Sequence, residues 1–154
     1  MNQTRSLSPS ESSANGPRSS SARILLADDS DDMRTLVALR LRQNGYSVTE
    51  CRNGAELLAE LKDYLQPTEV DRPGPRVDLI ISDIRMPGVF GTSVLEAATE
   101  YTDFPPTILI TAFGDDQTHA TARRFGARAV LDKPFDINVL MEKVREVLAG
   151  PATA

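Results

Sequence analysis

The chain has one cysteine, one histidine and no apolar stretch long enough to cross a bilayer. The single cysteine, Cys51, excludes an intramolecular disulfide and fits a reducing compartment, so we expect a cytoplasmic protein. The N-terminus lacks the apolar core of a signal peptide, and we expect no membrane partner. A formal net charge of −5 gives no reason to expect nucleic-acid binding.

The length and composition are ordinary for one globular domain, since 40% of the 154 residues are hydrophobic and 25% are charged. Residues 1–22 are rich in serine and cannot bury enough apolar surface to order themselves, which predicts a disordered tail. Prolines and a glycine within residues 66–76 predict a surface loop. We therefore expect one domain over residues 23–149 and a short C-terminal tail over residues 150–154.

Strand-like and helix-like patterns alternate from residue 23 onward. The sequence predicts strands over residues 24–27, 46–50, 77–81, 108–110 and 129–132. It predicts helices capped by Ser30, opened by Asn53 and capped by Asp136, with two more over residues 91–101 and 115–125. Five strand–helix units in a row indicate an α/β fold with a doubly wound parallel sheet and helices on both faces.

Apolar residues at helical spacing predict which side of each helix is buried. The first helix should bury Met33, Leu36, Val37 and Leu41. The second should bury Leu57, Leu58, Leu61 and Leu65. The last should bury Val139, Leu140, Val144, Val147 and Leu148.

Four predicted strands end at polar residues suited to phosphate chemistry. These residues are Asp28 and Asp29, then Asp83, then Thr111, then Lys133. Parallel strands place their carboxyl ends on one edge of the sheet, where open α/β folds bind ligands. Three carboxylates, one hydroxyl and one ammonium are therefore expected to meet in one crevice.

The chemistry of that crevice follows from its charges. Asp83 follows the most apolar strand and can act as a nucleophile that forms an aspartyl phosphate. Two like charges about 4 Å apart repel by roughly 4 kcal/mol at an effective dielectric constant near 20. Three carboxylates therefore call for a cation or for raised pKa values, and Mg²⁺, a hard ion with oxygen ligands, meets this need. Lys133 can pair with Asp83 and later with a phosphoryl oxygen, to which Thr111 can also donate.

Four segments at these strand ends resemble the signatures of the response-regulator receiver domain. They are residues 28–29 (DD), 82–88 (SDIRMPG), 110–113 (ITAF) and 132–135 (DKPF). The resemblance spans about residues 23–149 and implies a flavodoxin-like (βα)5 fold with sheet order 2-1-3-4-5. It also implies a phosphoprotein of two-component, phosphorelay signalling. Such a domain takes a phosphoryl group from a histidine kinase or histidine phosphotransfer protein onto one aspartate, here Asp83.

The resemblance implies roles for the other site residues as well. Asp29, Asp83 and the main-chain carbonyl of Arg85 would ligate Mg²⁺ directly, and Asp28 would do so mostly through water. Thr111 and Lys133 would contact the phosphoryl group. The bond between Lys133 and Pro134 is expected to be cis, and Mg²⁺ is the only cofactor implied.

One position departs from the family pattern. Receivers often carry an aromatic residue three positions before the lysine, and this chain has Val130 there. A short branched side chain cannot make the inward swing of a ring. We therefore expect any response to phosphorylation to come from Thr111 and the loop that follows it.

The output is expected to be a protein partner, because the chain ends right after the last predicted helix and leaves no room for a DNA-binding output domain. Arg123, Arg124 and Arg128 lie on the surface that receivers commonly offer to partners, although an ordinary solvated basic face is the favoured interpretation. His119 is expected to be a solvent-facing helix residue, not a phosphorelay donor, since one histidine carries no site geometry.

Two other functions remain open. A phosphatase of the haloacid-dehalogenase kind also uses a strand-end Asp, a Thr and a Lys with magnesium. Those enzymes usually have a second acid two positions after the nucleophile, where this chain has Arg85, and no substrate cap is apparent. The other alternative is a receiver-like interaction module that is not phosphorylated. We expect a phosphoacceptor that catalyses only its own phosphorylation and slow autodephosphorylation, and thus no enzyme.

Overall fold

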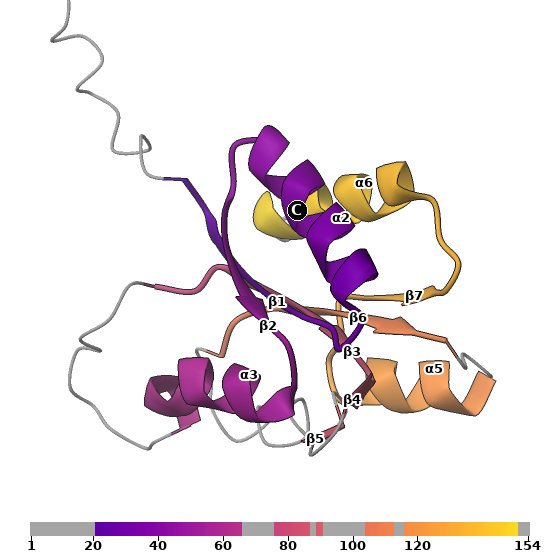
Figure 1. Cartoon of the computed structure of the whole chain (residues 1–154). Coiled ribbons are helices and arrows are strands. Elements are labelled where there is room, and N and C mark those ends of the chain that lie inside the picture. Colours follow the sequence, from indigo (N-terminus) through magenta and orange to yellow (C-terminus); the bar gives the residue numbers. More distant parts are fainter. Residues whose placement is uncertain (1–20, 66–75, 87–88, 91–103, 113–115, 151–154) are drawn as a thin grey trace, which may run out of the picture.

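In the computed structural model, five parallel strands form one sheet in the order β2-β1-β3-β6-β7 (Figure 1). The strands are β1 (Arg23–Ala27), β2 (Ser47–Cys51), β3 (Leu79–Asp83), β6 (Thr107–Thr111) and β7 (Ala129–Asp132). Counted along the chain within this sheet, the order is 2-1-3-4-5, which confirms the predicted fold. The structure describes residues 21–65, 76–86, 89–90, 104–112 and 116–150.

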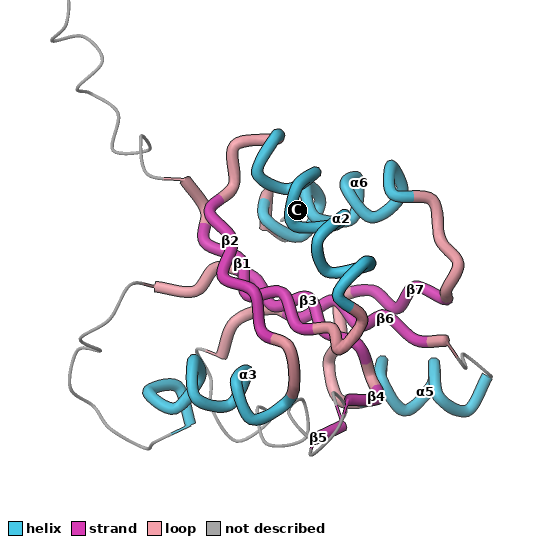
Figure 2. The backbone as a smooth tube through the Cα atoms, viewed as in Figure 1, coloured by secondary structure: helices cyan, strands magenta, loops and turns pink. Residues whose placement is uncertain are grey.

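Helices cover both faces of the sheet (Figures 1 and 2). On one face lie α2 (Asp31–Gln43) and α6 (Ile137–Leu148). On the other lie α3 (Gly54–Leu61), followed by the short 3-10 helix η2 (Lys62–Leu65), and α5 (Asp116–Arg124). The helix predicted over residues 91–101, the N-terminal tail up to residue 20, residues 66–75 of the predicted loop and residues 151–154 lie outside the described residues.

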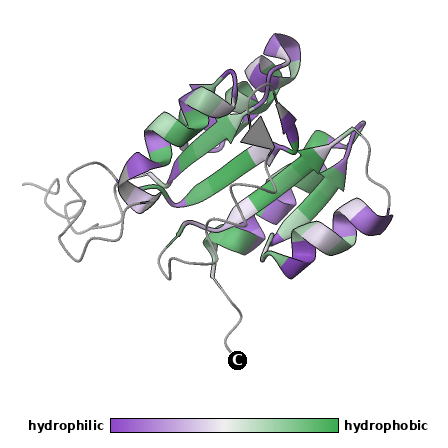
Figure 3. Ribbon diagram, turned by 90° about the horizontal axis from the view of Figure 1, so that it is seen from below, coloured by the Kyte–Doolittle hydropathy of each residue, from purple (hydrophilic) through white to green (hydrophobic). Residues whose placement is uncertain are grey.

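The sheet divides the core into two sides. Along β1, Ile24 and Leu26 pack with α2 and α6, while Leu25 and Ala27 pack with α3. All five residues of β3 are buried, as expected for a central strand covered on both faces. In Figure 3 the strands are hydrophobic along most of their length, and the helices are of mixed polarity.

The predicted helix starts are confirmed at all three capping residues. The side-chain oxygens of Ser30, Asn53 and Asp136 accept main-chain N–H groups of the first turns of α2, α3 and α6, at 3.2, 2.9 and 2.8 Å. The chain leaves α2 through Gly45, whose φ of 92° lies in the left-handed region that glycine adopts without strain.

The predicted burial of two residues, Leu36 and Val139, was wrong. Leu36 is 51% exposed and Val139 is 39% exposed. The buried stripe of α2 runs through Arg34, Val37, Ala38 and Leu41, so Leu36 lies outside it. In α6 the buried residues are Leu140, Met141 and Val144, which leaves Val139 at the edge of the buried face.

Other boundaries differ by small shifts. Strand β2 begins and ends one residue later than predicted, and β3 two residues later, so that Asp83 is the last residue of its strand. A hairpin of β4 (Arg85–Met86) and β5 (Val89–Phe90) follows Asp83 and was not predicted. Within the described part of the chain, no helix combines the length and hydropathy needed to span a bilayer.

Candidate phosphoacceptor and metal site

The register of the sheet places Asp28 beside Asp83. Ala27 of β1 pairs with Ser82 of β3, so the next residue of each strand lies at the same level of the sheet. The main-chain N–H of Asp28 continues the β1–β2 ladder by donating to the carbonyl oxygen of Cys51 at 3.1 Å. Both aspartates are buried at the carboxyl edge of the sheet.

Thr111 and Lys133 reach the same edge from β6 and β7. Asp83 pairs with Ile110, which puts Thr111 one residue beyond Asp83 in the register. Thr111 pairs with Asp132, and the N–H of Lys133 donates to the Thr111 carbonyl oxygen at 2.7 Å. Thr111 is buried at the carboxyl end of β6, one step beyond the partner of Asp83.

Lys133 bridges the two buried carboxylates. Its Nζ lies 2.9 Å from Oδ2 of Asp83 and 3.2 Å from Oδ2 of Asp28. The peptide bond between Lys133 and Pro134 is cis, as expected. The lysine therefore lies against the two carboxylates and does not extend into solvent as a lone surface lysine would.

The three aspartates fit a hard divalent cation. One carboxylate oxygen each of Asp28, Asp29 and Asp83 lies within 4.8 Å of the others. Asp28 and Asp83 are buried, whereas Asp29 is exposed and leaves the group open to solvent. An all-oxygen donor set with one open side is what Mg²⁺ prefers, since this ion usually keeps several waters.

Arg85 touches the site through its main chain. Its N–H donates to Oδ1 of Asp83 at 3.0 Å, while its side chain is exposed. Asp83 therefore has Lys133 on one carboxylate oxygen and Arg85 on the other. The metal-ligand role of the Arg85 carbonyl stays a prediction, as do the chemical roles of the other site residues.

For both Asp28 and Lys133, burial and nearby charges shift the pKa in opposite directions. Burial raises the pKa of the Asp28 carboxyl, and this effect outweighs the Ser30 N–H bond and the Lys133 charge, which favour the ionised form. Partial burial works against the charged form of Lys133, but the hydrogen bond and charge of Asp83 and Asp28 outweigh it and raise the pKa of the lysine. The crevice thus holds a firmly charged lysine beside a carboxylate that is costly to ionise.

Comparison with known families identifies the family of this chain. A sequence model described as "Response regulator receiver domain" matches residues 24–145, most of the chain. The chain belongs to the response-regulator receiver family. As a receiver domain of two-component systems, it is a member of a family of phosphoacceptors that generally bind Mg²⁺ at an acidic pocket.

Two curated relatives of this receiver are transcriptional regulatory proteins. GlrR of Escherichia coli is 32% identical over 134 residues, which are 86% of this chain and 28% of that protein. TrcR of Mycobacterium tuberculosis is 30% identical over 126 residues, 82% of this chain and 45% of that protein. The receiver spans less than half the length of either relative, so the expectation that it works without an output domain stays a prediction.

Solved receiver structures share the fold. A CheY-like receiver domain from Methanospirillum hungatei superposes with a TM-score of 0.72 at 26% identity and covers 84% of this chain and 95% of that one. CheY4 of Vibrio cholerae gives a TM-score of 0.68 at 28% identity and covers 83% of this chain and 99% of that one.

The prediction that His119 faces solvent was wrong, whereas the expectation that it is no phosphorelay donor stays a prediction. Its side chain is only 20% exposed, and its Nε2 lies 2.8 Å from Oδ1 of Asp132, the last residue of β7. The contact ties α5 to the strand that precedes Lys133. The lone histidine of this receiver is thus half-buried and has an acidic partner 13 residues away, which no local pattern indicates.

Val130 packs beneath α5. It contacts a small buried cluster of Ile84, Leu109 and Ala122, together with Phe125 and Ala127. The expectation that this receiver responds to phosphorylation without a ring at this position stays a prediction.

Sequence reasoning missed one residue that contacts the site, Arg34 of α2. Its guanidinium is buried and donates to the main-chain oxygen of Asp28. Helical spacing was the available signal, since Arg34 stands three and four residues before the buried Val37 and Ala38.

Replacing Asp28 with Asn is expected to stabilise the receiver by about 1 kcal/mol at pH 7 when a chelator removes divalent cations. The fold raises the pKa of Asp28, so its contribution to stability is present below the ordinary carboxyl pKa near 3.8 and is lost as pH rises through the raised value. At pH 7 the ionised carboxylate therefore weakens the fold. Asparagine removes the charge and keeps an oxygen for the Ser30 N–H.

Urea unfolding in chelator at pH 7 measures this effect, and the gain should vanish at about pH 3, where the carboxyl is protonated in both states. Asp32→Asn is the matched control, because Asp32 is exposed in the first turn of α2 and should change stability by no more than about 0.5 kcal/mol. An Asp28→Asn protein no more stable than wild type at pH 7 would contradict the expectation.

Proposed function

We propose that this receiver accepts a phosphoryl group on the carboxylate of Asp83. An oxygen of Asp83 forms the new bond to phosphorus while the P–N bond of a phosphohistidine donor breaks. The electron pair of that bond returns to the imidazole nitrogen, which takes up a proton. The donor is a histidine kinase or histidine phosphotransfer protein. We expect the phosphoryl transfer to take place in the cytoplasm, because a free cysteine such as the buried Cys51 fits a reducing compartment.

One observation carries the proposal. Asp28, Asp29 and Asp83 have oxygens within 4.8 Å of one another, and Lys133 lies 2.9 Å from Asp83 in the same crevice. Phosphoryl transfer needs mainly positioning and neutralisation of charge, and this group of side chains supplies both. A structural role alone does not call for three carboxylates at one sheet edge.

Each residue has a task before or after transfer. Lys133 holds the Asp83 carboxylate before transfer and is placed to pair with a phosphoryl oxygen afterwards. The Arg85 N–H orients the other oxygen of Asp83, and Thr111 offers a hydroxyl from the buried end of β6. A Mg²⁺ ion held by the three aspartates would neutralise charge as the phosphoryl group arrives.

Intact-protein mass spectrometry tests the proposal. The receiver is incubated with acetyl phosphate and Mg²⁺, and wild type is expected to gain the mass of one phosphate. Asp83→Asn should gain none, because an amide oxygen is too weak a nucleophile to replace the carboxylate. Asp32→Asn, an exposed aspartate on α2, is the matched control and should gain phosphate as wild type does.

The outcomes separate the candidate functions. No mass gain in wild type would reject phosphoacceptance and favour an interaction module that is not phosphorylated. Catalytic turnover of small phosphate esters such as p-nitrophenyl phosphate, with many products per protein chain, would favour a haloacid-dehalogenase-type phosphatase. A gain of one phosphate that Asp83→Asn abolishes supports the proposal.

A further inference from the structure

Arg34 is a buried cation whose guanidinium faces the acidic edge of the sheet. It stands in the first turns of α2 and is 7% exposed, although the other buried residues of that helix are apolar. A buried charge is tolerated only where partners satisfy it. The partners of Arg34 therefore show what its burial accomplishes.

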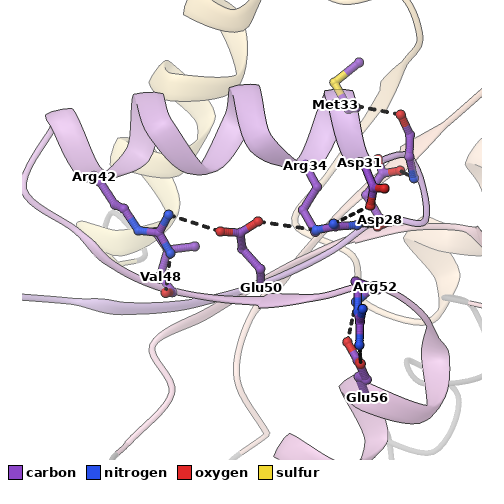
Figure 4. Close-up of polar contacts among 10 residues, drawn as sticks. Asp28, Asp31, Met33, Arg34, Arg42, Val48, Glu50, Arg52 and Glu56 are labelled. Carbon is purple, nitrogen blue, oxygen red and sulfur yellow. Dashed lines mark hydrogen bonds and ion pairs between the residues drawn. The ribbon is translucent and has the colours of Figure 1, made fainter.

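Three groups bind the guanidinium (Figure 4). Its Nη1 donates to the main-chain oxygen of Asp28 at 2.8 Å, its Nη2 pairs with Asp31, and its Nε donates to Oε1 of Glu50 at 3.3 Å. These contacts raise the pKa of Arg34, with the Asp31 hydrogen bond the largest cause. The planar fork of an arginine presents three separate nitrogens to acceptors on different sides, whereas a lysine has a single donor nitrogen.

Glu50 links this arginine to a second one. Its other oxygen, Oε2, accepts from Nη1 of Arg42 at 3.1 Å, and Arg42 also donates to the Val48 carbonyl oxygen at 3.0 Å. Figure 4 shows Glu50 between the two arginines, below α2 and above β2. The carboxylate of Glu50 thus has a fixed position from which it holds Arg34.

The main chain of Asp28 is consequently held on both sides. Its N–H donates to Cys51 of β2, and its carbonyl oxygen accepts from Arg34. That carbonyl belongs to the peptide that joins Asp28 to Asp29. The orientation of this peptide sets where the Asp29 carboxylate projects relative to Asp28 and Asp83.

We propose that Arg34 is a positioning residue for the acidic site, acting through the Asp28 carbonyl to hold the Asp28–Asp29 peptide in the orientation that binds a divalent cation. This inference rests on the proposed function, which requires that cation. Arg34 does not touch the cation or the phosphoryl group. Residues that orient metal ligands in this way commonly change metal affinity by ten- to a hundredfold when replaced.

Simple electrostatics predicts the opposite sign. Arg34 is a positive charge next to a site for a positive ion, so its removal would strengthen cation binding if charge alone mattered. Positioning predicts weaker binding. The direction of the change in Mg²⁺ affinity therefore distinguishes the two explanations.

The test is Mg²⁺ titration by isothermal calorimetry, without any phosphodonor. Arg34→Met keeps the side-chain length and removes all donors, and we expect Mg²⁺ to bind about tenfold more weakly than to wild type. Arg52→Met is the matched control, because it loses the same charge from a side chain that pairs with Glu56, outside the contacts of Arg34. Its affinity should stay within about twofold of wild type.

Arg34→Lys keeps the inference testable if the methionine variant folds poorly. It retains the charge, but its one nitrogen cannot occupy the three positions from which Nη1, Nη2 and Nε of Arg34 reach Asp28, Asp31 and Glu50. We expect Mg²⁺ to bind Arg34→Lys at least about threefold more weakly. Unchanged or tighter binding in a folded Arg34 variant would overturn the positioning role and leave the proposed function intact. A wild type that binds no Mg²⁺ would overturn both.

Discussion

Chelating the divalent cation is expected to slow phosphoryl transfer to Asp83 on the order of a thousandfold. The protein brings three carboxylates and one ammonium to the site, and the incoming phosphoryl group adds further negative charge. Each pair of like charges about 4 Å apart repels by roughly 4 kcal/mol at an effective dielectric constant near 20. Lys133 alone cannot offset this repulsion.

The size of the effect follows from that balance. A divalent ion removes several kcal/mol of unfavourable charge in such a site, and about 4 kcal/mol corresponds to roughly three powers of ten in rate. The time course of mass gain from acetyl phosphate measures it, with Mg²⁺ in one series and a chelator in the other. Sodium chloride at matched ionic strength controls for screening, and added Mg²⁺ should restore the rate.

Asp29→Asn extends this test to one ligand. Asp29 is the exposed member of the three aspartates, so its replacement should weaken cation binding without disturbing the core. The variant should need a higher Mg²⁺ concentration to reach half its maximal rate. Equal rates with and without the chelator would show that the acidic site works without a metal ion.

Much of the fold was predictable because its signals are local. Side-chain caps at Ser30, Asn53 and Asp136 mark helix starts within one turn, and apolar runs mark the strands. The meeting of Asp28, Asp83 and Lys133 was predictable for a different reason. Parallel strands share one carboxyl edge, so residues that end separate strands come together whatever lies between them.

The contacts that were missed depend on tertiary partners. Helical spacing counted Leu36 as buried and passed over Arg34, because an arginine can replace a leucine inside only where acceptors surround it. Those acceptors come from Glu50 of β2 and from the main chain of Asp28, and no pattern within α2 reveals them. The pairing of His119 with Asp132 is hidden in the same way.

The balance of charges at the site also affects the stability of the whole receiver, and the Lys133→Met variant should show this effect. Without a divalent cation, the free energy of unfolding of this variant at pH 7 is expected to be about 3 kcal/mol lower than that of wild type. The reason is that Asp28 and Asp83, which are 2% and 6% exposed, lose the ammonium that lies 3.2 and 2.9 Å from them. Removing one partner of a buried pair leaves uncompensated charge, which costs far more than the pair itself contributes.

The pH dependence has a definite sign. The pKa of Lys133 is raised in the folded state, so its stabilising contribution is complete below the ordinary lysine pKa near 10.5 and is lost only as pH rises through the raised value. At pH 7 the wild type therefore has the full contribution and the variant has none. Lowering the pH protonates Asp28, whose pKa burial raises, and should narrow the gap between the two proteins.

Urea unfolding with and without Mg²⁺ identifies the cause. A divalent cation can neutralise the carboxylates that Lys133 leaves behind, so it should bind the variant more tightly and restore part of the lost stability. Lys143→Met is the control, because Lys143 is partly exposed on α6 and its Nζ lies 3.6 Å from Oε1 of Glu146. Its effect should stay within about 0.5 kcal/mol.

Combining Lys133→Met with Asp28→Asn completes the argument. If repulsion between buried carboxylates causes the loss, removing one of them should recover a large part of it, and the two changes should be strongly non-additive. If Lys133 stabilises only by packing its methylene chain, methionine would replace it well, and neither Mg²⁺ nor Asp28→Asn would rescue the variant. A stability loss that is the same in Mg²⁺, in chelator and in the double variant would therefore refute the electrostatic account of this site.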